Sequence, residues 1–392
     1  MTVGTSCPDD LSQNYGISSG AGWAYADSVI AEPLSSHAAI TSACRTGLDA
    51  RGLYDRVAAE LVRLVPFDEF CWLGTDPGTL IPISNISGAG SLGAMAALAW
   101  ELELQTPDVN KFAFLARSPH RVGVLSDATG GELDRSPRYR RLIVPQGFGH
   151  ELRAALVASG VCWGFLALFR GLGEPDFTAA DATTIATLVP HLAAAQRASL
   201  LARPATNRPD RESQGVIVLD PSGRVEMFNQ AATHWLDACT DTIPDEHDRR
   251  LPDVILATAA TVRARLTLGQ PTITAGSRMR TRAGDWLSVQ GSLLSSSDGQ
   301  PRIAVVLGPA PTSAVIPLLM QAYDLSRREH DVTTAVLAGR TTEEIGTQLF
   351  ISPYTVQDHL KAVFDKVGVR SRRELIAQLY SRHYLQSPRP HN

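Results

Sequence analysis

Apolar and polar positions follow two different periods along the chain, and these periods predict where its elements lie. Apolar residues that recur every three or four positions predict a helix with one buried face, and short apolar runs bounded by turn residues predict strands. In the first half, the expected elements are a helix beginning near Leu53, strands at 70–73, 80–83 and 122–125, a helical stretch over about 92–114, a hairpin over 152–169, and a long helix capped by Thr178 and Asp181.

The second half begins after a polar segment with two prolines, Arg203 to Glu212, which has the composition of an interdomain linker. A helix that carries Trp235 and Leu236 is expected from Asn229, and an irregular stretch is expected between this helix and residue 277. The expected strands are 215–219, 224–228, 277–281, 286–294 and 303–307.

Antiparallel strands with helices to one side indicate domains of the α+β class. The chain has 392 residues, which is more than one compact core normally holds, so we expect a multidomain protein. The predicted division is a partly flexible N-terminal extension over 1–47, an α+β domain over 48–202, a linker over 203–211, a second α+β domain over 212–310, an all-α domain of four helices over 318–385, and a tail over 386–392.

Charge and cysteine content narrow the class of protein. The net charge is −4, yet residues 325–383 carry more Arg and Lys than Asp and Glu, so a mildly basic end follows an acidic body. Five cysteines without a CxxC pair indicate neither a disulfide framework nor a zinc site. No Lys or Arg precedes Arg45, so no signal peptide is predicted, and the uncharged run 154–169 is too short to span a membrane. We therefore expect a soluble, cytoplasmic protein.

Signals for helix starts recur at short intervals near the C-terminus. A hydroxyl residue followed three positions later by Glu can form a capping box, in which each side chain bonds the backbone N–H of the other residue. Ser352 before Pro353 is a further start signal, because proline favours the first helical position. These signals predict four short helices, with capping boxes at Ser326 and Glu329, at Thr341 and Glu344, and at Ser371 and Glu374.

The third of these helices has two different faces. At about 100° per residue, one narrow arc is apolar, and we expect it to be buried. Long polar side chains project from another arc, as readout of the DNA major groove requires, although the solvated surface of a small helical domain has the same pattern. The apolar arc comprises Val356, Leu360, Val363 and Val367, and the polar arc comprises Tyr354, Gln357, Asp358, Lys361 and Asp365.

The whole segment resembles the LuxR-type helix-turn-helix. The resemblance is carried by Leu325-Ser-Arg-Arg-Glu-His-Asp-Val332, Ala338-Gly339, Glu344-Ile345-Gly346, Leu349-Phe-Ile-Ser352, Thr355-Val356, His359-Leu360, Lys366-Val-Gly-Val369 and Ser371-Arg372. It implies a sequence-specific, DNA-binding transcriptional regulator in which Gln357, Asp358 and Lys361 contact base edges. The residues that it implies for the DNA backbone or for helix positioning are Ser352, Tyr354, Thr355, Val356, His359, Arg370, Arg372 and Arg373.

Two positions depart from the family pattern. Gln357 stands where a basic residue is usual, and Asp358 adds a negative charge toward the DNA. Glutamine can pair with adenine and aspartate can accept from cytosine, each worth about 1–3 kcal/mol of discrimination, so we expect an altered operator preference. The alternative is an adaptor protein that keeps the fold but binds no specific operator. Few phosphate contacts per domain imply a homodimer on double-stranded DNA, with RNA polymerase as a further candidate partner.

The upstream domains carry looser resemblances. Residues 48–200 resemble a GAF sensor domain from LuxR-type regulators of actinobacterial kind, and residues 212–310 resemble a degenerate PAS-type domain. Together these resemblances imply a one-component sensor of a small molecule or a partner, whose identity the sequence does not give. The stretches that carry the GAF resemblance are Asp108-Val-Asn-Lys-Phe112, Ala128-Thr-Gly-Gly131, Ser136-Pro-Arg-Tyr-Arg140 and Cys162-Trp163-Gly164.

Reactive side chains show no catalytic or metal-binding arrangement in the sequence. Cys71 and Cys162 each precede a tryptophan, and buried structural thiols explain them better than a redox or metal sensor does. The chain has no phosphate-binding glycine pattern, no metal spacing and no pairing of a nucleophile with a base. We therefore expect no cofactor, no metal, no catalytic residues and no enzymatic activity.

Overall fold

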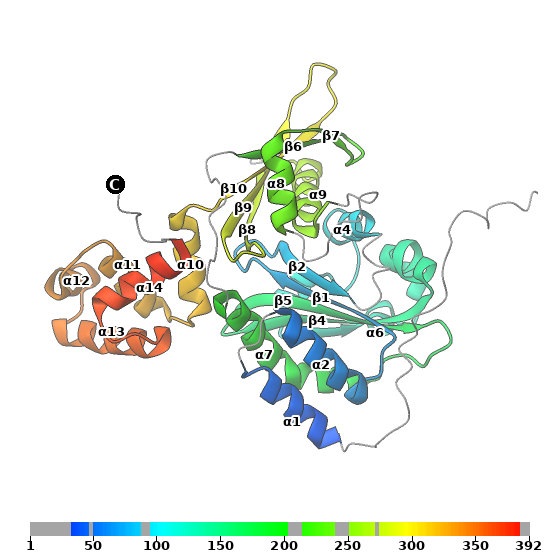
Figure 1. Ribbon diagram of the computed structural model, residues 1–392. Helices are drawn as coiled ribbons and strands as arrows, with labels where there is room; N and C mark the ends of the chain where they lie inside the picture. The colour runs from blue at the N-terminus through cyan, green and yellow to red at the C-terminus, as the bar shows by residue number, and fades with distance from the viewer. Residues whose placement is uncertain are drawn as a thin grey trace, which may run out of the picture. The chain divides into compact units, whose positions relative to one another are not determined.

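The computed structural model describes residues 33–46, 50–87, 95–202, 214–239, 251–270 and 274–384. Residues 1–32, the predicted linker, the predicted tail and the beginning of the helical stretch expected at 92 lie outside the described residues. The described part contains two antiparallel sheets with their helices, followed by a group of C-terminal helices (Figure 1). This arrangement confirms the predicted fold class, two α+β regions followed by an all-α region.

The first sheet has five antiparallel strands in the order β2-β1-β5-β4-β3. The long hairpin of β4 and β5 provides its centre, and it includes the hairpin predicted over 152–169. β2 begins two residues later than predicted, because Leu80 takes a left-handed conformation, with φ 60°, in the turn before it. The strands are β1 Glu69–Thr75, β2 Pro82–Ser87, β3 Val122–Val124, β4 Phe148–Ala158 and β5 Val161–Gly171.

Helices cover both faces of this sheet (Figure 1). On one face the Tyr54 hydroxyl, from α2, donates to Gln196 Oε1 of α7 at 2.8 Å, and Tyr54 also packs against Trp72 of β1. On the other face Phe112, from α5, stacks on Phe165 of β5. The helices are α1 Pro33–Ala43, α2 Ala50–Leu64, α4 Ala96–Leu104, α5 Phe112–Arg117, α6 Leu125–Thr129, the short turns η1 Leu133–Arg135, η2 Tyr139–Ile143 and η3 Val144–Gln146, and α7 Ala179–Ala202.

Helix α1 corrects the expected N-terminal extension. Its side chains Ile40 and Ala43 are buried, so the last part of residues 1–47 packs into the first α+β region. The helix is rich in Ser and Ala, and it therefore lacks the strong apolar period from which a helix can be predicted. The predicted capping box of α7 is present, since Asp181 N donates to Thr178 Oγ1 and Thr178 N donates to Asp181 Oδ2.

A cluster of buried charges lies on the α5 side of the first sheet. Glu151 Oε2 is 2.7 Å from Arg138 Nη2, and its Oε1 is 2.8 Å from Arg153 Nε. Arg153 also reaches Glu103 at 2.7 Å, and Arg138 lies 3.3 Å from Asp108. Each arginine thus lies between two carboxylates, which is the arrangement that makes buried charge tolerable.

The second sheet repeats the strand order of the first, with β7-β6-β10-β9-β8 in place of β2-β1-β5-β4-β3. Its core includes Ile217, Trp235 and Val305. The strands are β6 Gly215–Leu219, β7 Val225–Phe228, β8 Thr274–Arg280, β9 Trp286–Leu294 and β10 Arg302–Pro309, and the helices are α8 Gln230–Cys239 and α9 Asp253–Thr267.

Helix α9 occupies most of the stretch expected to be irregular, so that expectation is wrong from Asp253 to Thr267. Eight of its residues are buried, and they lie on several sides of the helix. Because the first α+β region and the second sheet both contact α9, no continuous polar stripe is needed, and the sequence lacks the period that predicts a surface helix.

Buried polar contacts join the two α+β regions. The carboxylate of Asp76 is fully buried, and its Oδ1 lies 2.6 Å from Arg278 Nη2 on β8. Asp253, at the start of α9, accepts from Trp100 Nε1 at 2.7 Å and from Asn85 Nδ2 at 2.9 Å. Hydrogen bonds between side chains far apart in sequence therefore fix the two regions against each other.

The C-terminal helices complete the described part. Helix α10, which the sequence pattern does not predict, crosses residue 318, where we expected the last domain to begin, and it buries Val315, Leu318 and Leu319. The four helices that follow correspond to the four predicted ones. The bounds are α10 Thr312–Ala322, α11 Arg327–Leu337, α12 Thr342–Leu349, α13 Pro353–Val367 and α14 Arg372–Tyr384.

Candidate nucleic-acid interface

Capping side chains fix the starts of the C-terminal helices. Complete capping boxes are present at Ser326 with Glu329 and at Thr341 with Glu344, as predicted. The third box is half formed: Glu374 N donates to Ser371 Oγ, but the Glu374 carboxylate accepts from Arg370 N instead of Ser371 N. That prediction is therefore wrong for the carboxylate, which reaches one residue further back along the turn.

The turn between α12 and α13 is tight. Helix α12 ends at Leu349, the capping residue Phe350 has φ 57°, and Ile351 N donates to Gly346 O at 3.0 Å. A Cβ on Gly346 would lie 2.8 Å from Ile351 O, so only glycine lets the turn fold back so closely. Ser352 Oγ then accepts from Thr355 N at 3.1 Å and caps α13. These contacts define the angle at which α13 leaves α12.

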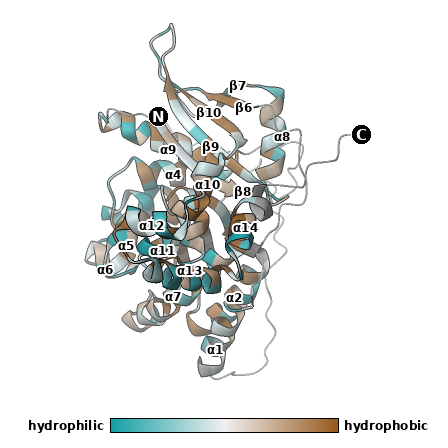
Figure 2. Ribbon diagram, turned by 90° about the vertical axis from the view of Figure 1, so that its left-hand side faces the viewer, coloured by the Kyte–Doolittle hydropathy of each residue, from teal (hydrophilic) through white to brown (hydrophobic). Residues whose placement is uncertain are grey.

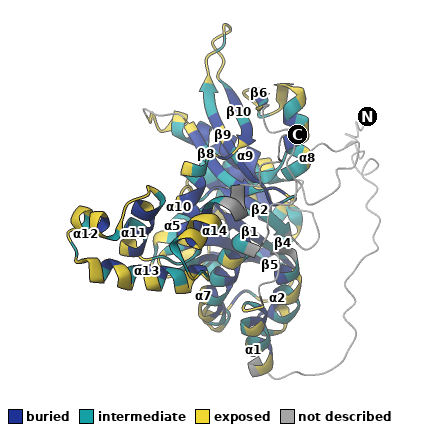
Figure 3. Ribbon diagram, turned by 60° about the vertical axis from the view of Figure 1, so that its left-hand side comes forward, coloured by how far each residue is buried: buried dark blue, intermediate teal, exposed yellow. Residues whose placement is uncertain are grey.

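Helix α13 has the two predicted faces. Its buried residues pack toward α11 and α12, while exposed residues lie along its outer side (Figure 3). Hydrophilic residues are prominent on α12 and α13 in Figure 2. The buried face is Val356, Leu360, Val363 and Val367, and the exposed face is Tyr354, Gln357, Asp358, Lys361 and Asp365.

The residues implied for base contacts lie together on this exposed face. Gln357 and Asp358 are adjacent, Lys361 lies one turn later on α13, and all three are exposed. Gln357 Nε2 lies 3.5 Å from Thr342 Oγ1, a long contact that leaves the amide available to another partner.

Most of the residues implied for the DNA backbone or for helix positioning lie near the two ends of α13, and His359 lies in its middle. Tyr354 is 76% exposed at the start of the helix, and Arg370 and Arg373 are exposed beyond its end. A helix of 15 residues is roughly 22 Å long at 1.5 Å per residue, longer than the roughly 12 Å width of a major groove. Of the remaining residues, Ser352 is exposed, Thr355, His359 and Arg372 are half-buried, and Val356 is buried in the core.

Three features of this region are not evident from the sequence pattern. Phe350 is 94% exposed in the turn before α13. Arg372 donates to the carbonyl of Arg340 and so joins α14 to the turn before α12. Lys366 Nζ lies 2.6 Å from Glu329 Oε2. Burial alone would raise the pKa of Glu329, but the bonds from Lys366 and Ser326 outweigh it and hold this pKa below its ordinary value.

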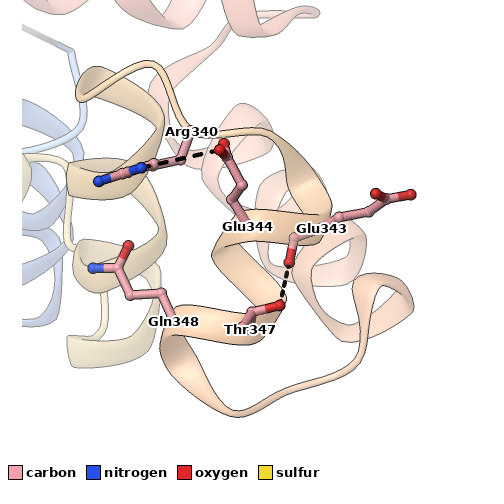
Figure 4. A pocket seen from close by; sticks show the side chains of 5 residues that line it. All are labelled: Arg340, Glu343, Glu344, Thr347 and Gln348. Atoms are coloured by element: carbon pink, nitrogen blue, oxygen red, sulfur yellow. Dashed lines mark hydrogen bonds and ion pairs between the residues drawn. The ribbon is translucent and has the colours of Figure 1, made fainter.

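A hollow lies beside α12, lined by polar and charged side chains (Figure 4). Arg340 Nη1 lies 4.0 Å from Glu344 Oε1, and Thr347 Oγ1 donates to the carbonyl of Glu343. Its lining residues are all exposed and none is apolar, whereas a small-molecule site is enclosed and mostly apolar. The fifth lining residue is Gln348.

Thiols in the described residues are poor nucleophiles. Burial raises the pKa of Cys162 to about 11 and that of Cys239 to about 12. Burial also raises the pKa of Cys71 far above its ordinary value. Among the described residues, no group of three or more His, Cys, Asp or Glu side chains is placed to hold a metal ion. No described helix is long and apolar enough to cross a membrane.

Known proteins are similar to this chain mainly in its last part. The family described as bacterial regulatory proteins of the luxR family matches residues 324–379. The spore germination protein GerE of Bacillus subtilis is 36% identical over 55 residues, which cover 14% of this chain and 74% of that protein. A putative HTH-type transcriptional regulator of Mycobacterium bovis is 42% identical over 52 residues, 13% of this chain but 6% of the relative.

Solved structures that match this chain are more distant in sequence. SdiA of Escherichia coli has 11% identity and a TM-score of 0.31, covering 88% of this chain and 96% of that one. The VqsR LBD domain of Pseudomonas aeruginosa has 15% identity and a TM-score of 0.31, covering 43% of this chain and 95% of that one. Both TM-scores are below 0.5.

Proposed function

This chain belongs to the LuxR family of bacterial regulatory proteins, which are DNA-binding transcriptional regulators, and we propose that it reads its operator with Gln357, Asp358 and Lys361 of α13. In this proposal Ser352 and Thr355 hold the start of α13, and Tyr354, His359, Arg370, Arg372 and Arg373 contact phosphates. The proposed function involves no catalytic residues.

One observation carries this proposal, the exposed polar face of α13. Gln357, Asp358 and Lys361 project from a helix whose opposite side is locked in the core and whose start is capped. A rigid helix with free polar side chains can enter a major groove and offer donors and acceptors to base edges. In such a groove Lys361 would donate to guanine and Gln357 would pair with adenine.

Lys361→Ala tests the assignment of the recognition face. We expect operator affinity to fall about fivefold or more, because one lost base contact costs about 1–3 kcal/mol. The measurement is footprinting and fluorescence anisotropy with the full chain on the DNA upstream of its own gene. Arg135→Ala is the matched control, since Arg135 is an exposed cation on the first α+β region. Equal affinity of wild type and Lys361→Ala for the operator would overturn the assignment.

An adaptor protein without specific DNA binding is the second candidate, and Asp358 is the observation that favours it. A carboxylate on the outer face of α13 repels phosphates, and Gln357 supplies no compensating charge. Gel shifts over a range of salt concentrations separate the two functions. An adaptor gives no sequence-specific complex at any salt, whereas a regulator keeps its preference for the operator as overall affinity falls.

The proposal extends to the upstream regions. We assign residues 48–202 to a GAF-like domain of actinobacterial kind, 203–211 to a linker, 212–310 to a PAS-like domain and 318–385 to the helix-turn-helix domain. The protein acts in the cytoplasm as a homodimer, because one helix-turn-helix makes few phosphate contacts, and RNA polymerase is a candidate partner. A small molecule or a protein partner binds the upstream domains. Native mass spectrometry of freshly purified protein would report the dimer and any bound ligand together.

A further inference from the structure

The junction between α10 and α11 contains an unusual residue. Helix α10 ends in a Schellman motif, in which Leu325 N donates to Met320 O and Asp324 N donates to Gln321 O. Asp324 occupies the left-handed position of this motif, with φ 59°, where glycine is the ordinary choice. An aspartate at this position is strained relative to glycine.

The Asp324 side chain bonds the first α+β region. Its Oδ1 lies 3.0 Å from Arg197 Nη1 on α7, and the hydroxyl of Ser159, in the turn between β4 and β5, bonds the same carboxylate. Burial alone would raise the pKa of Asp324, but these two bonds hold this pKa below its ordinary value. The carboxylate is therefore an ionised acceptor shared by two elements of the first region.

The Asp324 backbone bonds the recognition helix. Its carbonyl accepts from Lys366 Nζ at 3.0 Å, and Lys366 lies in the last turn of α13. The same ammonium binds Glu329 of α11. Through its side chain and its carbonyl, Asp324 thus connects α7 to α13 across the junction that separates the first region from the helix-turn-helix.

We propose that Asp324 is a positioning residue, which holds the helix-turn-helix in one orientation on the first α+β region and so prepares it for the operator. The inference rests on the proposed DNA-binding function. Gln357 and Lys361 are exposed while every bond of Asp324 is made, so the held orientation leaves the recognition face free. Holding the domain in advance lowers the ordering cost of binding. Because the ion pair with Arg197 is partly exposed, it is weak, and a signal in the first region can release it.

Asp324→Gly in the full chain tests the proposal against a simple charge effect. Glycine suits the left-handed position, so the end of α10 is kept while the side-chain bonds are lost. Removing a negative charge alone predicts tighter DNA binding, whereas loss of the held orientation predicts weaker binding. We expect operator affinity to fall by about three- to tenfold, since a dimer loses two such contacts. Glu343→Gln, the same change of charge at an exposed site on α12, should bind as tightly as wild type or more tightly.

A double-mutant cycle and proteolysis complete the test. Arg197→Met combined with Asp324→Gly should bind as Asp324→Gly does, whereas independent sites would give multiplied losses. Trypsin should cut after Arg327 and Arg328, which are exposed beside the junction, faster in both single variants than in wild type and Glu343→Gln.

The proposal would be overturned if the Asp324→Gly variant bound the operator as tightly as wild type and trypsin cut it at the wild-type rate. If the wild type binds no operator at all, the proposed function fails instead, and the trypsin rates alone then decide whether Asp324 holds the junction.

Discussion

Glu151, at the residue scale, shows how charge can be kept inside the first α+β region. Its side chain is almost fully buried between Arg138 and Arg153. Burial alone would raise the pKa of Glu151, but the two arginines outweigh it, so this pKa is below its ordinary value. The carboxylate therefore stabilises the fold fully above its unfolded-state pKa, near 4.3, and this contribution is lost as pH falls through the folded-state pKa.

Glu151→Gln should lower the free energy of unfolding by about 3–5 kcal/mol at neutral pH, because two buried arginines lose their shared partner. Urea denaturation measures this loss, and the difference from wild type should narrow in acid. Glu101→Gln is the matched control, since Glu101 pairs with Arg141 on the surface, and it should cost at most about 1 kcal/mol. Equal losses for the two variants would contradict this account of the cluster.

At the scale of the element, the start of α12 depends on one hydroxyl. Thr341→Ala removes the acceptor of the Glu344 N–H and should cost about 0.5–2 kcal/mol. Hydrogen exchange of the first turn of α12 is the measurement, and it should become faster. Thr347→Ala on the same helix is the control, because the Thr347 hydroxyl bonds only the Glu343 carbonyl among the described contacts and alanine favours a helix. Faster exchange in the control alone would refute the role of the cap.

Sequence patterns predict elements well where the cause is local. The caps at Thr341 and Ser352 and the two faces of α13 depend on residues within one or two turns, and they lie where the pattern places them. The sequence pattern does not predict helix α9. Its buried positions face partners from both α+β regions, so its apolar residues show no helical period. Asp324 was not predictable either, because its partners Ser159 and Arg197 come from a distant part of the chain.

At the scale of the whole described molecule, two sheets with the same strand order are joined by the buried carboxylate of Asp76. Asp76→Asn weakens its pairing with Arg278, so the two α+β regions should no longer unfold together. Denaturation monitored by hydrogen exchange should then show two transitions, with the second α+β region unfolding first. Asp298→Asn is the control, since Asp298 pairs with Arg302 on the surface within the second region. A single transition shared by Asp76→Asn and wild type would count against this coupling.

The contacts of Asp253 have a practical consequence for anyone who wishes to study the first α+β region in isolation. A truncated protein that stopped at Ala202 would retain Trp100 and Asn85 but lose the carboxylate that both side chains bond. The indole and the amide would then face water beside newly uncovered apolar surface, which favours aggregation. Expression of the two α+β regions as one piece, through Pro309, keeps these groups paired.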